Sequence, residues 1–191
     1  MKNENLKLRG IKLYLRYPKI EDLAEFTALN IASKKFHRGL VNPPTDKKSF
    51  TEYLKRNDSE TNECLLICEI ESGKIAGAVN LSQIFHGVFQ NAYLGYYIGA
   101  DFAGKGLMSE AIYLMLQFAF KNLKLHRVEA NVQPHNLSSI AVLRKNNFTK
   151  EGFSRKYLKI GGHWRDHERW AIIFEDWKGS EVKSKKAKVK S

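Results

Sequence analysis

The chain has 191 residues, of which 43% are hydrophobic and 27% charged, so it can bury the core of one soluble domain. No run of about 18 uncharged apolar residues occurs, and the first five residues lack the apolar region of a secretory signal. We therefore expect a cytoplasmic protein without a membrane partner. The formal net charge of +12 predicts attraction to polyanions.

Part of this charge lies in a C-terminal segment. Residues 178–191 contain six lysines, one glutamate and no aromatic residue, a composition that cannot bury enough surface to fold. We expect a single domain over residues 1–177, followed by a disordered lysine-rich tail over 178–191. Simple solvation of this tail and electrostatic attraction to RNA or ribosomes are both compatible with its composition.

The spacing of apolar residues predicts that the first half of the chain opens with a strand and two helices and continues with a meander. Alternation over 10–16 predicts an edge strand, and helical spacing over 20–32 and 45–55 predicts two helices separated at Pro43-Pro44. Three apolar segments then predict an antiparallel meander, with strands over 63–71, 74–84 and 92–99.

The second half of the chain predicts one parallel strand pair. The expected elements are a helix over 105–122, a strand over 127–132, a helix over 137–146, and a hairpin of strands 157–160 and 163–173 around Gly161-Gly162. A strand, helix, strand order requires parallel pairing, so the helix over 105–122 should cross the sheet as a right-handed connection.

The cysteines indicate packing and not chemistry. Cys64 and Cys68 are the only two in the sequence, and both lie on one apolar, strand-like run. Their spacing places them on one face of a strand, and neither has partners at the spacing of zinc ligands. We expect two core thiols and no metal site.

The segment from Asp101 to Glu110 joins a predicted strand to a long apolar helix. Gly104 and Gly106 allow a ligand to approach the backbone, and the N–H groups at a helix N-terminus attract an anion. This pattern predicts a pyrophosphate cradle for a nucleotide-bearing cofactor. A Walker loop is disfavoured because Gly106 replaces its Ser or Thr, and a dinucleotide fingerprint lacks its third glycine. A helix start with two convenient glycines is the alternative.

The order of these elements resembles the GNAT acyl-CoA N-acyltransferases. Four motifs support the resemblance: Tyr97-Ile98-Gly99, Gly104 to Ala111, Asn136-Leu137-Ser138-Ser139, and Asn146-Asn147-Phe148. They fall where that family carries its acetyl-CoA loop, its Asn-x-x-Ser and its terminal Gly-Phe. Two further segments, 127–136 and 162–167, resemble the ribosomal-protein-alanine N-acetyltransferases. The family resemblance covers roughly residues 7–177.

The resemblance implies an α/β (α+β) fold with a mixed central sheet of about seven strands and helices on both faces. It also implies acetyl-CoA as co-substrate, no metal, and direct attack on the thioester by the N-terminal α-amino group of a protein, such as the Ala or Ser of a ribosomal protein. The implied cofactor-binding residues are Tyr97, Ile98, Gly99, Ala103, Gly104, Lys105, Gly106, Leu107, Met108, Ser109 and Asn136.

The sequence departs from the family pattern at three places. Asp101 stands where a Gln or Arg usually assists the phosphates, so backbone N–H groups and Lys105 must hold them. Leu143 stands where a tyrosine often protonates the thiolate, and we assign that role to Ser139, which could also cap its helix. Tyr93 and Asn131 stand where relatives carry acidic residues, which leaves the amine's proton acceptor unassigned.

Three catalytic candidates follow from this comparison: Ser139, Tyr93 and Asn131. Tyr93, Asn131 or a residue of the strand over 163–167 could orient a water chain that removes the amine's proton. Strands splayed between 92–99 and 127–132 would offer free backbone groups to pantetheine, and an N–H near Ile98 would polarise the thioester carbonyl.

Two other functions are compatible with the sequence. The first is acetylation of a small amine such as a polyamine or an aminoglycoside on the same fold. The second is an acyl-CoA-binding or RNA-binding module without catalysis. We expect Tyr93, Tyr96 and Trp164 to crowd the amine pocket, and the protein to be a monomer or a dimer.

Overall fold

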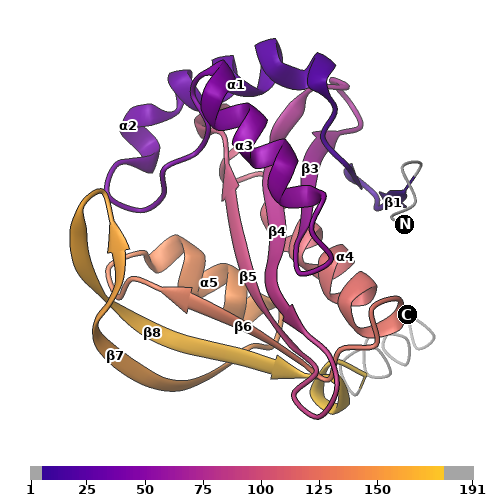
Figure 1. Cartoon of the computed structure of the whole chain (residues 1–191), viewed down its shortest axis with the longest axis vertical. Coiled ribbons are helices and arrows are strands. Elements are labelled where there is room, and N and C mark those ends of the chain that lie inside the picture. Colours follow the sequence, from indigo (N-terminus) through magenta and orange to yellow (C-terminus); the bar gives the residue numbers. More distant parts are fainter. Residues whose placement is uncertain (1–5, 179–191) are drawn as a thin grey trace.

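The computed structural model describes residues 6–178, which form one sheet with helices packed against it (Figure 1). In chain order the elements are β1 (Lys7–Arg9), β2 (Leu13–Arg16), the 3₁₀ turn η1 (Ile20–Asp22), α1 (Leu23–Ala32), α2 (Lys34–His37), α3 (Lys47–Asn57), β3 (Glu63–Glu69), β4 (Ile75–Phe85), β5 (Asn91–Ile98), the 3₁₀ turn η2 (Ala100–Phe102), α4 (Leu107–Lys121), β6 (Arg127–Val132), α5 (Leu137–Lys145), β7 (Thr149–Ile160) and β8 (His163–Ile173).

Within residues 6–178, eight strands form one sheet in the order β1-β2-β3-β4-β5-β6-β8-β7. Neighbouring strands are antiparallel except β5 and β6, which are parallel because α4 crosses between them. The mixed sheet, the α/β class and the parallel pair predicted from the sequence are therefore confirmed.

The sheet has one strand more than the seven predicted, because β1 precedes the expected strand over 10–16, whose first residues form a turn and whose last four form β2. The N–H of Gly10 donates to the carbonyl of Leu13 at 2.9 Å, which leaves β1 as a separate edge strand paired with β2. The Glu110 carboxylate of α4 holds this turn by accepting from the N–H groups of Ile11 and Lys12. Apolar periodicity contains no signal of this contact between distant segments.

Helices α1 and α3 cover one face of the sheet. Their aromatic side chains, Phe26, Phe50 and Tyr53, form a buried cluster with the strand residues beneath them. Cys64 and Cys68 lie in that cluster as buried free thiols, as the sequence predicted. This layer holds the first helices against β3, β4 and the end of β5.

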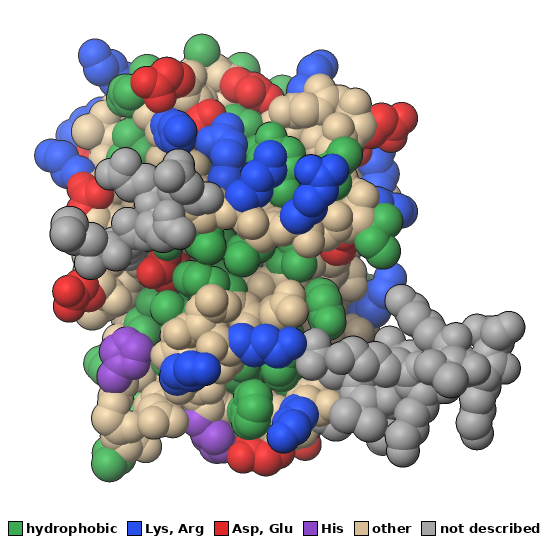
Figure 2. Space-filling view, turned by 90° about the vertical axis from the view of Figure 1, so that its right-hand side faces the viewer, with side chains coloured by type: hydrophobic (Ala, Val, Ile, Leu, Met, Phe, Trp, Pro, Cys, Tyr) green, Lys and Arg blue, Asp and Glu red, His purple; other side chains and the backbone are tan. Residues whose placement is uncertain are grey.

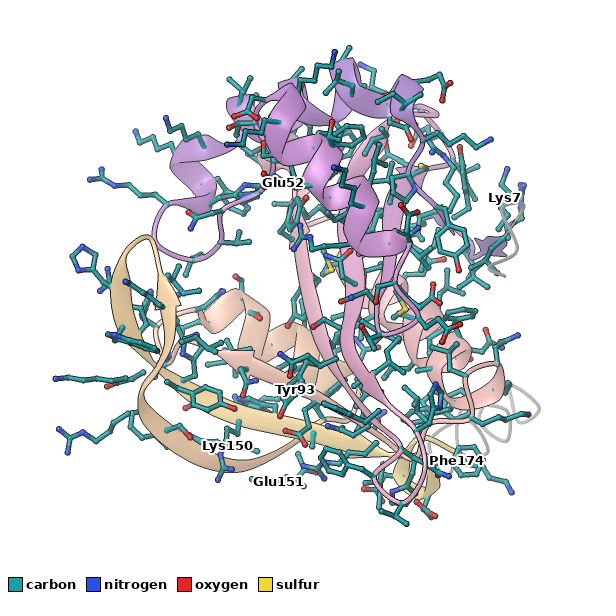
Figure 3. All side chains as sticks on the ribbon, in the orientation of Figure 1. Lys7, Glu52, Tyr93, Lys150, Glu151 and Phe174 are labelled. Atoms are coloured by element: carbon teal, nitrogen blue, oxygen red, sulfur yellow. The ribbon has the colours of Figure 1, made fainter. Side chains whose placement is uncertain are left out.

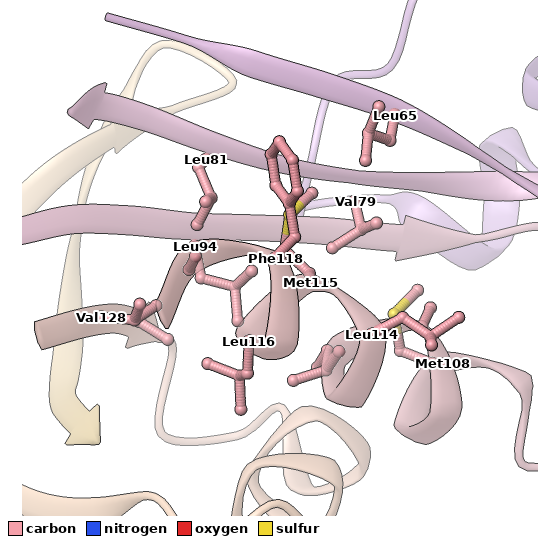
Figure 4. Packing of buried hydrophobic residues seen from close by; sticks show 14 of the residues in the cluster. Leu65, Val79, Leu81, Leu94, Met108, Leu114, Met115, Leu116, Phe118 and Val128 are labelled. Atoms are coloured by element: carbon pink, nitrogen blue, oxygen red, sulfur yellow. The ribbon is translucent and has the colours of Figure 1, made fainter. Parts of the chain in front are cut away.

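Helix α4 crosses the opposite face and supplies more buried residues to the larger core than any other element (Figure 4). Leu114, Met115 and Phe118 of α4 pack in one cluster with Leu81 of β4 and Leu94 of β5. Removing such apolar surface from water contributes about 1.5–3 kcal/mol for each large side chain. The packing fixes the N-terminus of α4 beside the end of β5.

Strands β5 and β6 pair only at their first residues. Their register runs from Asn91 opposite Arg127 to Tyr93 opposite Glu129 and stops there. Beyond this point the two strands diverge, as Figure 1 shows. The splay that the resemblance implied is present, and it opens the sheet between the second half of β5 and the end of β6.

Strand β7 is much longer than the predicted segment over 157–160. It begins at Thr149, and the sequence did not indicate this part because most of its side chains are exposed and charged. Its register with β8 is irregular between Lys150 and Gly152 and between Ser154 and Leu158. Such bulged, solvent-facing strands lack the apolar alternation on which the prediction depended.

The surface agrees with a basic composition. On the face in Figure 2, several Lys and Arg side chains lie in a row across the upper half, with acidic and hydrophobic side chains around them. Within residues 6–178 no helix is long and apolar enough to cross a bilayer. The predicted disorder of the lysine-rich tail falls, apart from Lys178, outside the described residues.

Gly77 of β4 provides a test of how closely β4 and β5 approach. A Cβ at Gly77 would lie 2.3 Å from the carbonyl oxygen of Tyr97, which is backbone and cannot move aside without shifting β5. We expect Gly77→Ala to lower the free energy of unfolding by about 1–3 kcal/mol, measured by urea denaturation.

Gly95→Ala is the matched control in the same strand pair. A Cβ at Gly95 would meet no atom within 4 Å, and a tolerated Gly to Ala change stabilises by restricting the unfolded chain. Equal losses of stability in the two variants would contradict the close approach at Gly77.

Candidate active site

A cavity of about 440 Å³ lies where β5 ends and where α4 and α5 begin. Nine of the eleven predicted cofactor-binding residues line it: Tyr97, Ile98, Ala103, Gly104, Gly106, Leu107, Met108, Ser109 and Asn136. The fold thus brings three segments that are separate in the sequence onto one wall. The remaining wall comes from α2, the loop after it and the exposed side of α5.

Gly99 and Lys105 are the two predicted residues that do not line this cavity. A Cβ at Gly99 would lie 2.3 Å from Cδ1 of Leu29, so glycine is needed there for packing of α1. The Nζ atom of Lys105 lies 5.2 Å from the ring centre of Phe102. Gly99 therefore leaves room for Leu29, and the Lys105 side chain contacts Phe102.

The turn before α4 has the geometry of an anion cradle. Gly104 and Gly106 have φ values of 77° and 81°, and a Cβ at either position would meet no atom within 4 Å. The first bond of the helix is donated by the N–H of Glu110 to the carbonyl of Gly106, at 3.3 Å. The N–H groups of the preceding helical residues are therefore free for a ligand at the positive end of the helix dipole. The open space and these donors fit a pyrophosphate.

Helix α5 presents a second set of residues to the same cavity, which the sequence analysis missed in part. Ser138, Ala141, Val142 and Lys145 all line it. Their spacing of three and four residues places them on one side of the helix, so the signal was present in the sequence. Lys145 adds a positive charge at the end of α5 that could contact a phosphate.

Asn136 and Ser139 meet at the N-terminus of α5. The Oδ1 atom of Asn136 accepts from the N–H of Ser139 at 3.2 Å and from the hydroxyl of Ser138 at 2.9 Å. Asn136 therefore caps α5, and it also lines the cavity. The hydroxyl of Ser139 is not the capping group, so it is available for chemistry.

Tyr96 is the partner of Ser139, and the sequence analysis had named it only as a bulky neighbour. The two hydroxyl oxygens are 2.6 Å apart. Burial raises the pKa of Tyr96, with the Ser139 hydrogen bond acting weakly in the opposite direction, so the phenol is protonated at neutral pH. Because side chains alternate along a strand, Tyr96 lies on the face of β5 towards α5. This alternation is visible in the sequence.

A smaller chamber of about 160 Å³ lies between the diverging ends of β5 and β6 and shares five lining residues with the larger cavity: Leu40, Val41, Tyr96, Asn136 and Ser139. Its other lining residues are Leu94, Gly95, Ala130, Asn131, Val132, Gln133 and His167. None of these twelve residues is acidic, and none is Lys or Arg.

Two of the three predicted catalytic residues line the chamber, and the third does not. Ser139 and Asn131 line the chamber, and Oδ1 of Asn131 is buried without a hydrogen-bond partner. Tyr93 is absent from both walls and lies beside β6 and β8 (Figure 3). Burial, and then the nearby Glu129, raise the pKa of Tyr93. Tyr93 misses the chamber because side chains alternate along β5. Tyr96 points to the face that reaches the chamber, and Tyr93 points to the opposite face.

The backbone of β5 offers donors to the gap. The N–H of Gly99 donates to Ala76 of β4 at 2.8 Å, and N–H directions alternate along a strand. The N–H groups of Ile98 and Tyr96 therefore point away from β4, towards the side where pairing with β6 has ended. The Ile98 carbonyl on that side accepts from Nε2 of the buried His37 at 2.8 Å.

The hairpin of β7 and β8 places its two tryptophans differently. Trp170 is buried in the larger core. Trp164 is 60% exposed and lines neither cavity, so it does not crowd the chamber in this structure. Of the three residues expected to crowd the amine, Tyr96 alone lies in the chamber wall.

Comparison with known proteins identifies the family. The Acetyltransferase (GNAT) domain model matches residues 12–149. The probable N-acetyltransferase YjcK of Bacillus subtilis (strain 168) is 36% identical over 177 residues, which cover 88% of this chain and 98% of that protein. The ribosomal protein uS5-alanine N-acetyltransferase of Escherichia coli (strain K12) is 41% identical over 104 residues, 54% of each protein.

A solved structure gives the same result. RimJ of Mycobacterium smegmatis in complex with CoA-disulfide superposes with a TM-score of 0.79 and 26% identity, over 85% of this chain and 82% of that one. The chain belongs to the GNAT family and is an acetyl-CoA-dependent N-acetyltransferase.

Proposed function

We propose that this enzyme transfers acetyl to the N-terminal α-amino group of a protein that begins with Ala or Ser, such as a ribosomal protein. The observation that carries the proposal is the uncharged wall of the small chamber, where twelve lining residues include no acidic or basic side chain apart from His167. An amine must be neutral to attack, and such a wall offers no carboxylate to hold it as an ammonium ion.

This wall favours α-amino groups over the alternatives. An α-amino group with a pKa near ~8 is roughly one-tenth neutral at pH 7, whereas a lysine amine with a pKa near ~10.4 is neutral only at about the 10⁻⁴ to 10⁻³ level. A polyamine brings further positive charges that favour carboxylates nearby. The similarity to the uS5-alanine N-acetyltransferase supports the same acceptor class.

The larger cavity is the proposed site for acetyl-CoA. The cradle at Gly104 and Gly106 would hold the pyrophosphate, and Lys145 would add a charge at the outer end of α5. The free N–H groups of β5 beyond Tyr93 would pair with the pantetheine amides and polarise the thioester carbonyl. The thioester lies, in this proposal, where the two cavities share their wall.

The proposed reaction is direct attack without an acetylated enzyme. The amine nitrogen bonds to the thioester carbon, the C–S bond breaks, and the departing thiolate takes a proton from the hydroxyl of Ser139. The adjacent hydroxyl of Tyr96, 2.6 Å away, can replace that proton. Leu143, which stands where relatives often have a tyrosine, is fully buried in the core and cannot serve as the acid.

The cradle is tested by Gly106→Val. A branched side chain would fill the space that is open at Gly106, so we expect the Kd for acetyl-CoA to rise at least about tenfold in isothermal titration calorimetry. Gly73→Val is the control, because Gly73 also has a positive φ of 69° and open space but lies in the turn between β3 and β4. Similar Kd changes in both variants would remove the cradle from the site.

The acid is tested by Ser139→Ala. We expect kcat to fall on the order of 10²-fold with acetyl-CoA affinity nearly unchanged, because the proton transfer belongs to the transition state. Tyr96→Phe should give a smaller fall in kcat, since Ser139 keeps its own proton. Ser138→Ala removes a neighbouring hydroxyl that bonds Asn136 and should reduce kcat far less. A lower melting temperature with normal kcat in Ser139→Ala would leave only a structural role.

The acceptor is tested by competition among amines. Peptides that begin with Ala or Ser should have the highest kcat/KM, and a blocked peptide with an internal lysine should be nearly inert. The kcat/KM should rise with pH and level off near ~8, where the α-amino group becomes neutral. Faster acetylation of spermidine or of the blocked peptide at pH 7 would replace the proposed acceptor with a small amine or a lysine.

A further inference from the structure

His167 is a buried histidine for which the reaction described so far has no use. It is 3% exposed, it lies on β8 beyond the last residue paired with β6, and it lines the small chamber together with Asn131 and Ser139. The β6–β8 register places Asn131 opposite Arg169, so His167 follows on the same face of the sheet as Asn131. This face is opposite to the one that α5 covers.

The hydrogen bond of the imidazole fixes its tautomer. The Nδ1 atom lies 3.0 Å from the carbonyl oxygen of Arg165. A carbonyl oxygen only accepts, so Nδ1 must carry the proton, and in the neutral ring Nε2 keeps its lone pair. Such a bond from the backbone is how a histidine base is commonly oriented.

The other chamber residues cannot take this role. The amide of Asn131 has no basicity at neutral pH, and the phenol of Tyr96 is protonated and bonded to Ser139. Ser139 is assigned as the acid, and the remaining wall is apolar, glycine, or the amides of Gln133 and Asn136, of which Gln133 donates to the carbonyl of Gly39 at 2.8 Å. Among the residues that line the chamber, only His167 has a side chain of the type that accepts and releases protons near neutral pH.

We propose that Nε2 of His167 is the proton acceptor for the attacking amine. As the nitrogen lone pair forms the C–N bond, the N–H proton passes to Nε2, directly or through one water. The C–S bond breaks with its electrons on sulfur, and the thiolate takes a proton from Ser139. His167 then releases its proton to solvent, and Ser139 and Tyr96 regain theirs. Base and acid thus act from opposite faces of the splayed strands.

The surroundings of His167 keep the ring neutral. Burial lowers its pKa, and His135 on the loop before α5 adds to this effect, while the bond to Arg165 and the neighbouring Asp166 oppose it. Tyr157 of β7 contacts the ring at its edge, with ring centres 6.2 Å apart. Because the pKa of His167 is lowered, its ring is neutral at pH 7. Titration of this ring therefore does not contribute to the rise of kcat/KM between pH 7 and 8.

His167→Gln tests the proposal by kinetics. We expect kcat/KM at pH 7 to fall about 100-fold while the Kd for acetyl-CoA stays within about twofold. The residual rate should keep rising above pH 8 as hydroxide takes over the proton, where the wild type has levelled off. His126→Gln is the matched control, because His126 lies on the surface in contact with Glu175. A His167→Gln variant that retains kcat/KM within about threefold, or that loses acetyl-CoA affinity in parallel, would overturn the proposal.

A measurement on the wild-type protein does not depend on how the variant folds. Long-range ¹H–¹⁵N spectra of ¹⁵N-histidine protein should show His167 neutral at pH 7, with the proton on Nδ1. A charged ring, or a proton on Nε2, would equally overturn the proposal. The kinetics are run with an Ala peptide and with spermidine. If spermidine is the better acceptor, the N-terminal assignment fails, while the loss in His167→Gln is still measured on spermidine.

Discussion

The early end of pairing between β5 and β6 is the constraint on which the site depends. Only the first three residues of each strand are paired, and buried backbone groups without partners cost free energy comparable to a lost hydrogen bond. The gap is nevertheless maintained from outside. His37 holds the Ile98 carbonyl, Gln133 ties the end of β6 to Gly39, and Gly77 lets β4 approach β5 closely. The strands are held apart by the fold and leave donors for a substrate.

Each strand of the splayed pair carries different chemistry on its two faces. Tyr96 points towards α5 and meets Ser139, whereas Asn131 lies on the face shared with His167. The face of the sheet on which a strand residue lies therefore determines its role more than its closeness in sequence to a motif. Tyr93 and Tyr96 are three residues apart, yet only Tyr96 reaches the chamber. The gap connects the two faces, so in the proposed mechanism Ser139 can give a proton on one face while His167 takes one on the other.

Much of this architecture was predictable from local patterns. The apolar helix after two glycines and the Asn-x-x-Ser at the start of α5 predicted residues that line the larger cavity, which is the proposed site for acetyl-CoA. Contacts between distant segments were not predictable: the turn at Gly10 depends on Glu110, and the charged first part of β7 is a strand only because β8 pairs with it. The partnership of Tyr96 with Ser139 and the orientation of His167 belong to the same class, because a single sequence does not reveal which side chains meet.

The absence of charged side chains in the chamber wall bears on which amine can react there. A buried ammonium ion without a partner is strongly disfavoured, so an amine that enters this wall must leave its proton behind or transfer it on arrival. The cost rises with the pKa of the amine by about 1.4 kcal/mol per unit, which separates an α-amino group from a lysine by roughly 3 kcal/mol before any side-chain contact is made. A neutral imidazole is a strong enough base to take the proton of an α-amino group. Selectivity for N-termini can thus arise from the absence of charge in the chamber, with peptide contacts outside it deciding among N-terminal residues.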